Sequence, residues 1–545
     1  MGEKKSSYYS KFCIPEPERK HEDPASEIGS PAVGWCTVTT VMYLGLALLA
    51  SLSPLLTFAW LWQVKEWRFD RLREHLRSEG CFRQLFGLIR PTTVLILSIA
   101  GVFHAAFRPV WHTVALALLG ILTLVQLGLR KQRFPVWTQK AVTLVLSTLV
   151  VDTIIAYSWF SREPALLAVL PLFQAFTLAL SWFLFWPLDR FLKRRRMRRA
   201  QKLREQFPDL IVIGITGSVG KTTVKELLSC VLTGRNVQAT PAYVNSEMGV
   251  SSWLLKELSR QGDHPPEVLI VEMGAYRQGE IALLCRIAKP TMGIVTFIGK
   301  QHMGLFGSQE ALVNAKAELV EALPPDGIAF LNADNAACAA LAERTSCTVQ
   351  TVGTGGHTDI EAFDIEETPT GIAFRTGDTR FGIPLHGTHN VTNVLLAIAA
   401  ARTLGMRDRD IAQAVSKYTP PDHTFSVRTE KGVTILDDTH NASPHSFKAA
   451  IAWARTQPAK QKVLLTSGLI ELGTEQDHIH SELGETAQGV FDRVIFMNPR
   501  SGQFFGKGYK KPIEVCTPFT EKMGEDTLLI CIGRIPPATI QRLLP

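Results

Sequence analysis

A glycine-rich loop within residues 211–223 constrains this chain more than any other feature. The apolar run IVIGI breaks into TGSVGKTT, and the helical sequence VKELL follows. A strand, such a loop and a helix form a phosphate cradle, because glycines let backbone N–H groups approach phosphate oxygens at a helix N-terminus. The residues expected to bind a nucleotide are Gly217, Ser218, Gly220, Lys221, Thr222 and Thr223.

Within this loop, the Lys221 side chain is expected to reach the terminal phosphates and the Thr222 hydroxyl to bind Mg²⁺. The strict pattern has another glycine where Ile215 stands, so the loop is a variant. An ordinary surface loop is the alternative interpretation, and the flanking strand and helix favour nucleotide binding.

Five apolar stretches occupy the first third of the chain, at about 36–63, 92–108, 112–129, 137–158 and 165–187. Most approach the ~20 residues that a membrane-spanning helix needs. Trp and Phe near their ends favour a membrane over the alternative, a buried helical domain. The sequence therefore predicts a tail at 1–35 and an α-helical membrane region at 36–188 with about five transmembrane helices.

Lys and Arg gather in three segments, at 64–91, 130–133 and 190–204. With five spans all three lie on one side, which the positive-inside rule makes cytoplasmic. This predicts a multi-pass protein of the plasma membrane whose large C-terminal part is cytoplasmic. The run at 190–204, in a basic linker at 189–207, is expected to meet anionic lipid head groups rather than nucleic acid. Residues 64–91 form either a helix in the membrane interface or a solvated loop.

Cysteine spacing and composition exclude some classes of protein. The nine cysteines include no Cys-x-x-Cys pair, which argues against a zinc site or a disulfide framework. The hydrophobic fraction of 46% is too high for a disordered chain.

From about residue 209, short apolar strands alternate with helical stretches, which is typical of a parallel α/β sheet. Expected strands are 210–216, 268–273, 293–298 and 327–332. Because ligands sit beyond the carboxyl ends of such strands, Glu272 is placed to bind the Mg²⁺ that Thr222 also touches. His302 after the third strand is by itself more often a surface residue, and Lys316 in a helical stretch is more often solvated.

Eight sequence blocks resemble the central and C-terminal domains of the Mur ligases, which are ATP-dependent amide-forming enzymes of peptidoglycan synthesis. The blocks occur in the family's order and are nearest to the MurF-type branch, which adds D-alanyl-D-alanine. They are ITGSVGKTT, YVNSEMGV (243–250), VEMGAYRQGEI (271–281), HMGLFGSQEALVNAKAEL (302–319), LNADN (331–335), GTHNVTNVLLAIAAA (387–401), LDDTHNASPHSF (436–447) and SGLIELG…HSELGE (467–485).

The resemblance implies a central ATP-binding domain at 208–425, a smaller Rossmann-like C-terminal domain at 426–545, and ATP and Mg²⁺ as cofactors. It implies that His302 helps to hold a second Mg²⁺ and that Lys316 matches a lysine carried as a carbamate. Nucleotide contacts are implied for His389, Asn390, Asn393 and Asp438. The implied reaction is an ADP-forming acid–amino-acid ligation through an acyl phosphate, and the implied partners are a cell-wall precursor and an amino acid or dipeptide.

The chain departs from the family pattern in three places. Apolar segments stand where the family has a domain for a UDP-sugar, which suggests a lipid-linked acceptor. The arginine that follows the closing proline pair is missing, since the sequence after Pro421 reads DHTFS, around Thr424. His440 replaces the family's tyrosine. Because of these departures, an ATP-binding membrane scaffold with weakened catalysis remains an alternative function. An ATP-driven transporter is a weaker alternative.

Overall fold

The computed structural model describes residues 31–79, 81–87, 89–103, 108–259, 265–299, 303–368, 370–440, 442–470, 472, 475–515 and 522–545. The chain divides into two compact units. The membrane-type unit comprises the segment that ends at Gln63 together with Leu85–Ser181, and the ligase unit comprises Val64–Gln84 together with Trp182–Pro545. The domain boundaries expected from the sequence remain predictions.

Apolar helices make up the membrane-type unit. They are α1 (Pro31–Val64), α4 (Ile89–Phe103), α5 (Arg108–Gly128), α6 (Gln139–Phe160), the 3₁₀ helix η2 (Pro164–Leu172) and the first part of α7 (Gln174–Arg204), and the short α3 (Cys81–Phe86) leads into them. On α5 and α6, large apolar side chains recur at helical spacing on the outer face, among them Ile121 and Val125, and Leu146, Val150 and Ile154. Apolar exteriors of this extent occur at membrane contacts and at protein–protein contacts.

The structure revises the expected number of spans. Among the described residues, three helices are long and apolar enough to cross a membrane: Thr40–Val64, Val110–Gly128 and Gln139–Phe160. The fifth expected span is broken, because η2 and α7 meet at 75°, and counting that pair as one span gives four. The second expected span is the shorter apolar helix Ile89–Ala100. Pro171, which has no N–H to donate, lies in the last turn of η2, next to this break.

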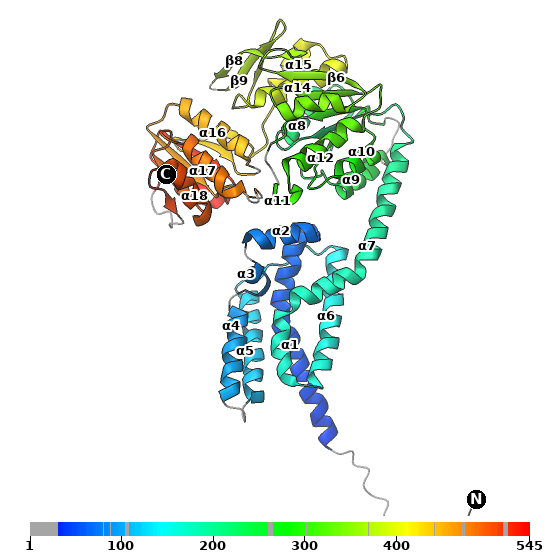
Figure 1. Ribbon diagram of the computed structural model, residues 1–545, viewed down its shortest axis with the longest axis vertical. Coiled ribbons are helices and arrows are strands. Elements are labelled where there is room, and N and C mark those ends of the chain that lie inside the picture. Colours follow the sequence, from blue (N-terminus) through cyan, green and yellow to red (C-terminus); the bar gives the residue numbers. More distant parts are fainter. Residues whose placement is uncertain are drawn as a thin grey trace, which may run out of the picture. The chain divides into compact units, whose positions relative to one another are not determined.

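A seven-stranded parallel sheet forms the centre of the ligase unit, in the order β2-β3-β1-β4-β5-β6-β7. Its strands are β1 (Ile211–Thr216), β2 (Val237–Ala239), β3 (Val268–Glu272), β4 (Met292–Val295), β5 (Ile328–Asn332), β6 (Thr348–Gly353) and β7 (Ile360–Glu361). The helices α9 (Glu247–Ser259), α10 (Glu280–Ala288) and α12 (Gln309–Glu321) cover one face, and α8 (Lys221–Val231) and α14 (Asn390–Thr403) cover the other (Figure 1). Shorter helices are α11 (Met303–Phe306), α13 (Ala336–Ala339) and the 3₁₀ helix η3 (Ala340–Arg344).

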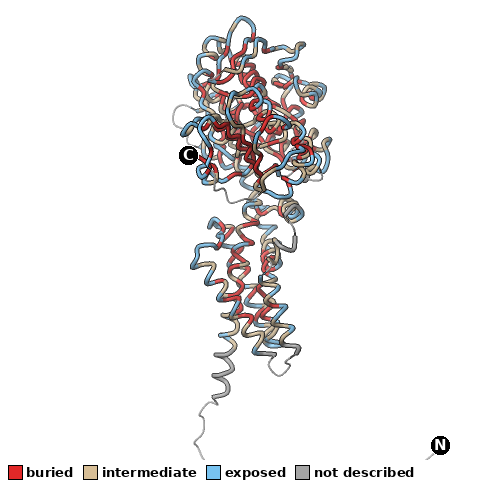
Figure 2. The backbone as a smooth tube through the Cα atoms, turned by 90° about the vertical axis from the view of Figure 1, so that its left-hand side faces the viewer, coloured by how far each residue is buried: buried red, intermediate tan, exposed pale blue. Residues whose placement is uncertain are grey.

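A small antiparallel sheet adjoins the face that carries α14. It consists of β8 (Phe363–Thr368), β9 (Gly371–Thr376) and β10 (Thr379–Ile383), in the order β10-β9-β8. Phe374 and Phe381 from this sheet join the core formed by α8, α14 and α15 (Asp408–Val415). In Figure 2 the buried residues of the ligase unit lie mainly in its interior and the exposed ones mainly at its outside.

The C-terminal part of the ligase unit is a six-stranded sheet in the order β11-β12-β16-β13-β14-β15, parallel except for β11. Its strands are β11 (Ser426–Glu430), β12 (Val433–Asp438), β13 (Gln461–Thr466), β14 (Arg493–Phe496), β15 (Glu514–Val515) and β16 (Thr527–Ile532). Its helices are α16 (Pro444–Thr456), α17 (Gln476–Thr486), α18 (Pro499–Tyr509) and α19 (Pro537–Leu543). This arrangement agrees with the expected small Rossmann-like domain.

The end of α7 is anchored to the ligase unit by Arg204. Its buried guanidinium donates hydrogen bonds to the carbonyls of Ala288 (3.0 Å) and Leu210 (2.9 Å), and a further one to Phe207. Carbonyl acceptors just before β1 and at the end of α10 therefore hold the last turn of α7 against the rest of this unit.

Candidate nucleotide site

The loop between β1 and α8 has the geometry of a phosphate cradle. Gly217 and Gly220 have φ angles of +149° and +84°, which residues with a side chain rarely adopt. A Cβ atom at Gly217 would collide with the Thr296 hydroxyl, and one at Gly220 with the Asn393 carboxamide. Both glycines are therefore required by the backbone and by the close approach of neighbouring side chains.

Lys221 opens α8 and folds back over the loop. Its ammonium group donates to the carbonyls of Gly217 (2.8 Å) and Ser218 (3.2 Å). Burial lowers the pKa of Lys221, although the nearby Glu272 carboxylate opposes this shift. Ser218 is fixed by its N–H bond to the Phe297 carbonyl (2.6 Å), and Thr223 is buried in the first turn of α8. An ammonium held over this glycine-rich loop is placed to meet phosphate oxygens.

The pair Thr222–Glu272 is the expected magnesium-binding feature, and the structure brings the two side chains together. The Thr222 hydroxyl donates to a Glu272 carboxylate oxygen at 3.1 Å. Asn245 donates to the other oxygen at 3.3 Å, and the Lys225 ammonium lies 3.4 Å from Glu272. One carboxylate and one hydroxyl suit Mg²⁺, which protein sites usually hold with few protein ligands plus substrate phosphates and water.

Sequence reasoning gave no role to Asn245 or Lys225. Asn245 lies in the block YVNSEMGV, and Lys225 comes one helical turn after Thr222, so both were open to prediction. Among the described residues no group of three His, Cys, Asp or Glu side chains could hold a metal ion.

Lys316 on α12 is buried rather than solvated, against the more common case for a helical lysine. Burial, followed by repulsion from Lys221, lowers its pKa to about 7, while Glu280 and Glu318 oppose the shift. A substantial fraction of the amine is thus neutral near pH 7, and the neutral amine is the form that reacts with CO₂. His302, expected to act with Lys316, and Asn441 lie outside the described residues.

His389, Asn390 and Asn393 lie at the start of α14, beside the phosphate loop. Asn393 donates to the Asn390 carboxamide (2.9 Å), and Asn390 donates to the His386 carbonyl (2.9 Å). Burial, with His445 adding repulsion, lowers the pKa of His389 to about 3, so its ring is neutral. The ring meets Phe425 edge-on at 4.8 Å, and its Nδ1 atom is buried without a hydrogen-bond partner. A neutral ring with a free nitrogen fits contact with a nucleobase.

Asp438 ends β12 and is buried, with its Oδ2 atom lacking a hydrogen-bond partner. Burial raises its pKa to about 6. Its neighbour Asp437 is bound on several sides: the imidazole of His423 (2.8 Å), the guanidinium of Arg428 (2.8 Å) and the Thr439 hydroxyl (2.7 Å) contact it. Arg428 also pairs with Glu430 (2.8 Å).

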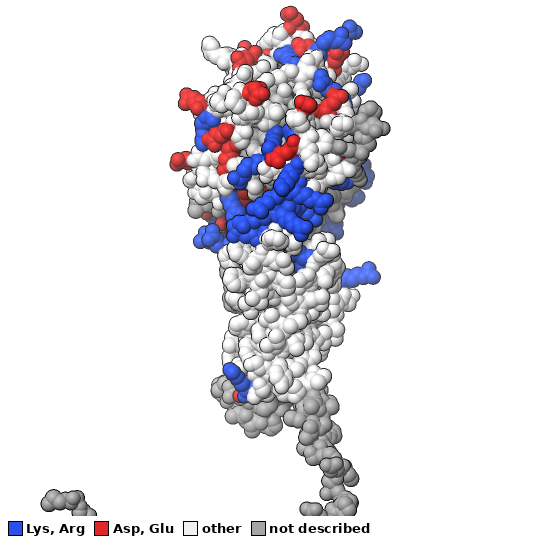
Figure 3. Space-filling model, turned by 90° about the vertical axis from the view of Figure 1, so that its right-hand side faces the viewer, with Lys and Arg blue, Asp and Glu red and all other residues white. Residues whose placement is uncertain are grey.

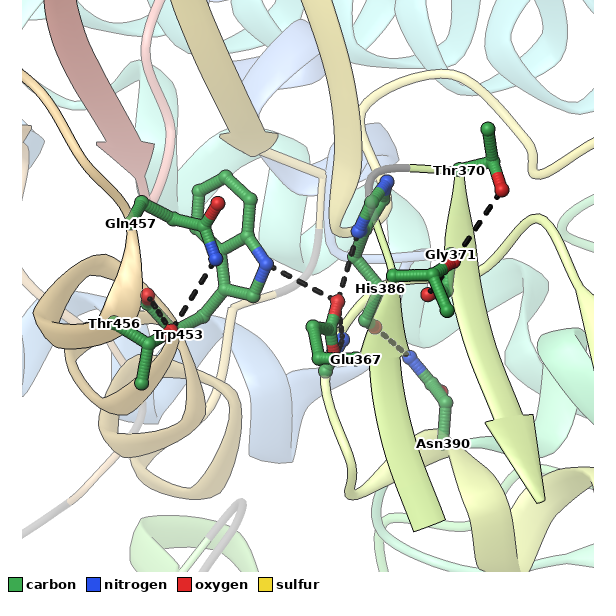
Figure 4. A network of polar contacts seen from close by, with 10 residues as sticks. Glu367, Thr370, Gly371, His386, Asn390, Trp453, Thr456 and Gln457 are labelled. Carbon is green, nitrogen blue, oxygen red and sulfur yellow. Dashed lines mark hydrogen bonds and ion pairs between the residues drawn. The ribbon is translucent and has the colours of Figure 1, made fainter.

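A hydrogen-bond network around Glu367 joins the C-terminal sheet domain to α14 (Figure 4). The Trp453 indole of α16 donates to Glu367 at 3.2 Å, and the Nδ1 atom of His386 lies 2.9 Å from the same oxygen. From His386 the chain of bonds continues through Asn390 to Asn393 beside the phosphate loop. The network thus connects α16 with the candidate nucleotide site.

Replacing Trp453 with phenylalanine tests this network. Phenylalanine keeps an aromatic ring but loses the indole N–H that donates to Glu367 and part of the buried ring volume, so we expect the free energy of unfolding to fall by at least about 1 kcal/mol. The measurement is the thermal midpoint of the ligase unit, with Trp137→Phe, an exposed tryptophan of the other unit, as control. Equal midpoints for the two variants would contradict a role for this hydrogen bond.

Comparisons with known proteins show which family the chain is similar to. The family model "Mur ligase middle domain" matches residues 215–401. The chain is 34% identical over 319 residues to the UDP-N-acetylmuramoyl-tripeptide–D-alanyl-D-alanine ligase of Bacillus subtilis, covering 57% of this chain and 68% of that ligase. The Synechocystis ligase of the same name is 37% identical over 280 residues, and the match spans 51% of this chain but only 60% of that enzyme.

Among solved structures, the crystal structure of MurF ligase from Thermotoga maritima in complex with ADP is similar at a TM-score of 0.56 and 27% sequence identity. The similarity covers 64% of this chain and 82% of that one.

Proposed function

The chain belongs to the Mur ligase family, and on this premise we propose that it is an ATP-dependent ligase of peptidoglycan precursor synthesis that adds a D-alanyl-D-alanine-type dipeptide or an amino acid to a carboxylate. The family and the ligase class expected from the sequence are confirmed, with relatives of the MurF type the most similar ones reported above. The site roles, the metal and the acceptor are part of the proposal.

One observation carries the proposal: Thr222 and Glu272 are in hydrogen-bond contact at the adjoining ends of α8 and β3, with Lys221 beside them. These are the residue types that hold a triphosphate and its magnesium. Magnesium, when bound there, supplies positive charge that neutralises the triphosphate.

The proposed reaction brings two anions together. A substrate carboxylate attacks the γ-phosphorus, the bond to the β–γ bridging oxygen breaks, and an acyl phosphate and ADP result. The amine then attacks the acyl carbon, inorganic phosphate leaves with the bonding electrons, and the amine proton is lost. Lys221 stabilises charge on the transferring group, because its ammonium is already oriented by two carbonyls. His389 and Asn390 orient the nucleobase of ATP. The reaction needs no nucleophile from the protein.

The acceptor is proposed to be lipid-linked. The apolar exterior of α5 and α6 supports a membrane location for the first unit. On α7, Lys and Arg gather in the patch that Figure 3 shows, with Arg194, Arg195, Arg196, Arg198, Arg199 and Lys202 exposed. Such a cluster directly after an apolar segment suits anionic lipid head groups on the cytoplasmic side. A substrate confined to the same bilayer has a raised effective concentration at a tethered site.

The test measures ATP-dependent phosphate release by the full-length chain in lipid nanodiscs, with D-alanyl-D-alanine and either a UDP-linked or a lipid-linked muramoyl tripeptide. Release with the lipid-linked acceptor supports the whole proposal. Equal release with the soluble acceptor contradicts the lipid-linked part alone. No release with any carboxylate and amine pair contradicts the ligase and favours the ATP-binding scaffold.

Replacing Glu272 with glutamine tests the metal assignment. Loss of the negative charge is expected to raise the magnesium concentration for half-maximal turnover by about tenfold or more, because a carboxylate is a preferred Mg²⁺ ligand. Glu267→Gln provides a matched control, since Glu267 is exposed just before the opposite end of the same strand. An unchanged magnesium dependence in Glu272→Gln would remove Glu272 from the site.

A further inference from the structure

The short helix α2 (Phe69–Glu79) belongs to the ligase unit, although it follows α1 in sequence. Only Lys65, Glu66 and Trp67 separate the end of α1 from Arg68, the residue just before α2. Trp67 and Leu72 are buried, and α2 contacts α11 (Figure 1). The sequence left open whether this segment is an interfacial helix or a loop, and the structure shows a helix docked on the ligase unit.

Two arginines make the docking contacts. Arg68 donates to Glu280 at 2.7 Å and is held in place by Asp70, also at 2.7 Å. The Arg71 guanidinium lies 4.3 Å from the centre of the Tyr276 ring, within cation–π range. The two side chains are only 16% and 13% exposed, which distinguishes them from ordinary surface arginines.

The surface that these arginines contact is the segment that follows Glu272. Glu280 is buried and accepts a hydrogen bond from the Tyr276 N–H at 2.8 Å, so it closes the turn that begins α10. At the other end of the segment, the Met273 N–H donates to the Ile215 carbonyl (2.8 Å) of the strand that enters the phosphate loop.

Neighbouring helices hold the middle of the same segment. Glu318, two residues after Lys316, accepts hydrogen bonds from the N–H groups of Gly279 and Ala282 (2.9 Å for Ala282). Residues 272–282 are therefore fixed by β1, α12 and α2 together. Of these three, only α2 comes from the N-terminal part of the chain.

We propose that Arg68 and Arg71 are positioning residues that clamp residues 272–282, so that α2 couples the N-terminal part of the chain to the geometry of Glu272 and Lys316. The clamp adds to the support that β1 and α12 give the same segment. The proposal rests on the proposed ligase function in one respect: one of its two tests measures ligase turnover.

The test compares Arg68→Gln and Arg71→Gln with Arg73→Gln and Arg77→Gln in the full-length chain. All four variants remove one positive charge from the α2 region, but Arg73 and Arg77 are exposed. We expect kcat to fall by about tenfold in the first pair, since small displacements of reacting groups have large kinetic effects. The KM for ATP should stay unchanged, because the phosphate loop is untouched. Arg68→Lys, which keeps an ion pair with Glu280, should restore part of the loss.

Amide hydrogen exchange supplies a second readout that needs no turnover. In Arg68→Gln the amides of residues 273–282 should exchange faster, and those of β1 and α8 should not. If the wild-type chain shows no ligation but this local change occurs, the clamp stands and the proposed function fails. If the exchange pattern and kcat of Arg68→Gln and Arg71→Gln match those of Arg73→Gln, the clamp is overturned.

Discussion

Replacing Lys221 with alanine is expected to lower ATP-dependent turnover by about a thousandfold. The ammonium is held by the carbonyls of Gly217 and Ser218 in the glycine-rich loop between β1 and α8. Removing one oriented charge from a transferring phosphoryl group has effects of about 10²–10⁵ in related chemistry. Single-turnover phosphate transfer and calorimetric binding of Mg²⁺–ATP measure the chemical step and the affinity separately.

Lys256→Ala is the control, because Lys256 is 56% exposed in its side chain and lies in the same unit. It should leave turnover and binding unchanged. If Lys221→Ala retains turnover within about threefold of the parent, the loop is not the phosphate site, since so small a change is below the effect of any oriented phosphate contact.

Much of the ligase unit was predictable because its signals are local. The expected strands at 210–216, 268–273 and 327–332 differ from β1, β3 and β5 by at most one residue at an end, whereas the strand expected at 293–298 is β4, which ends at Val295. Buried parallel strands are apolar throughout, and the carboxyl ends of adjacent strands meet, so Glu272 could be placed beside Thr222 before any coordinates.

Other features depend on contacts that a single segment does not reveal. The sheet of β8, β9 and β10 contributes Ile372, Phe374, Phe381 and Ile383 to the core that also contains α14, a packing that only the tertiary structure identifies. Arg68 in a run of arginines does not differ in local sequence from Arg73, yet only Arg68 meets Glu280. The broken span at η2 and α7 likewise depends on how the chain packs around Pro171.

Replacing Lys316 with methionine is expected to stabilise the ligase unit while abolishing turnover. The folded-state pKa of about 7 lies below the ordinary value of 10.5. Between these two values the unfolded chain binds more protons than the folded chain, so the free energy of unfolding rises with pH there. Below pH 7 both states are protonated, and the burial of the charge costs on the order of several kcal/mol. Methionine fills a similar volume without a charge and removes both the cost and the pH dependence.

Lys225→Met should lower the stability of the ligase unit, which makes it a control for the stabilising change at Lys316. Lys225 is as deeply buried as Lys316, but its ammonium lies 3.4 Å from Glu272 and 3.3 Å from Glu226. Its removal leaves the Glu272 carboxylate without this cation, a change that typically destabilises by about 3–5 kcal/mol. Thermal midpoints of both variants between pH 6.5 and 10, compared with turnover, measure these opposite effects. The expectation fails if Lys316→Met has a lower thermal midpoint than the parent at pH 6.5 and keeps the parent's pH dependence. Burial of the Lys316 ammonium would then not destabilise the folded state, and the burial would not be evidence for a catalytic role.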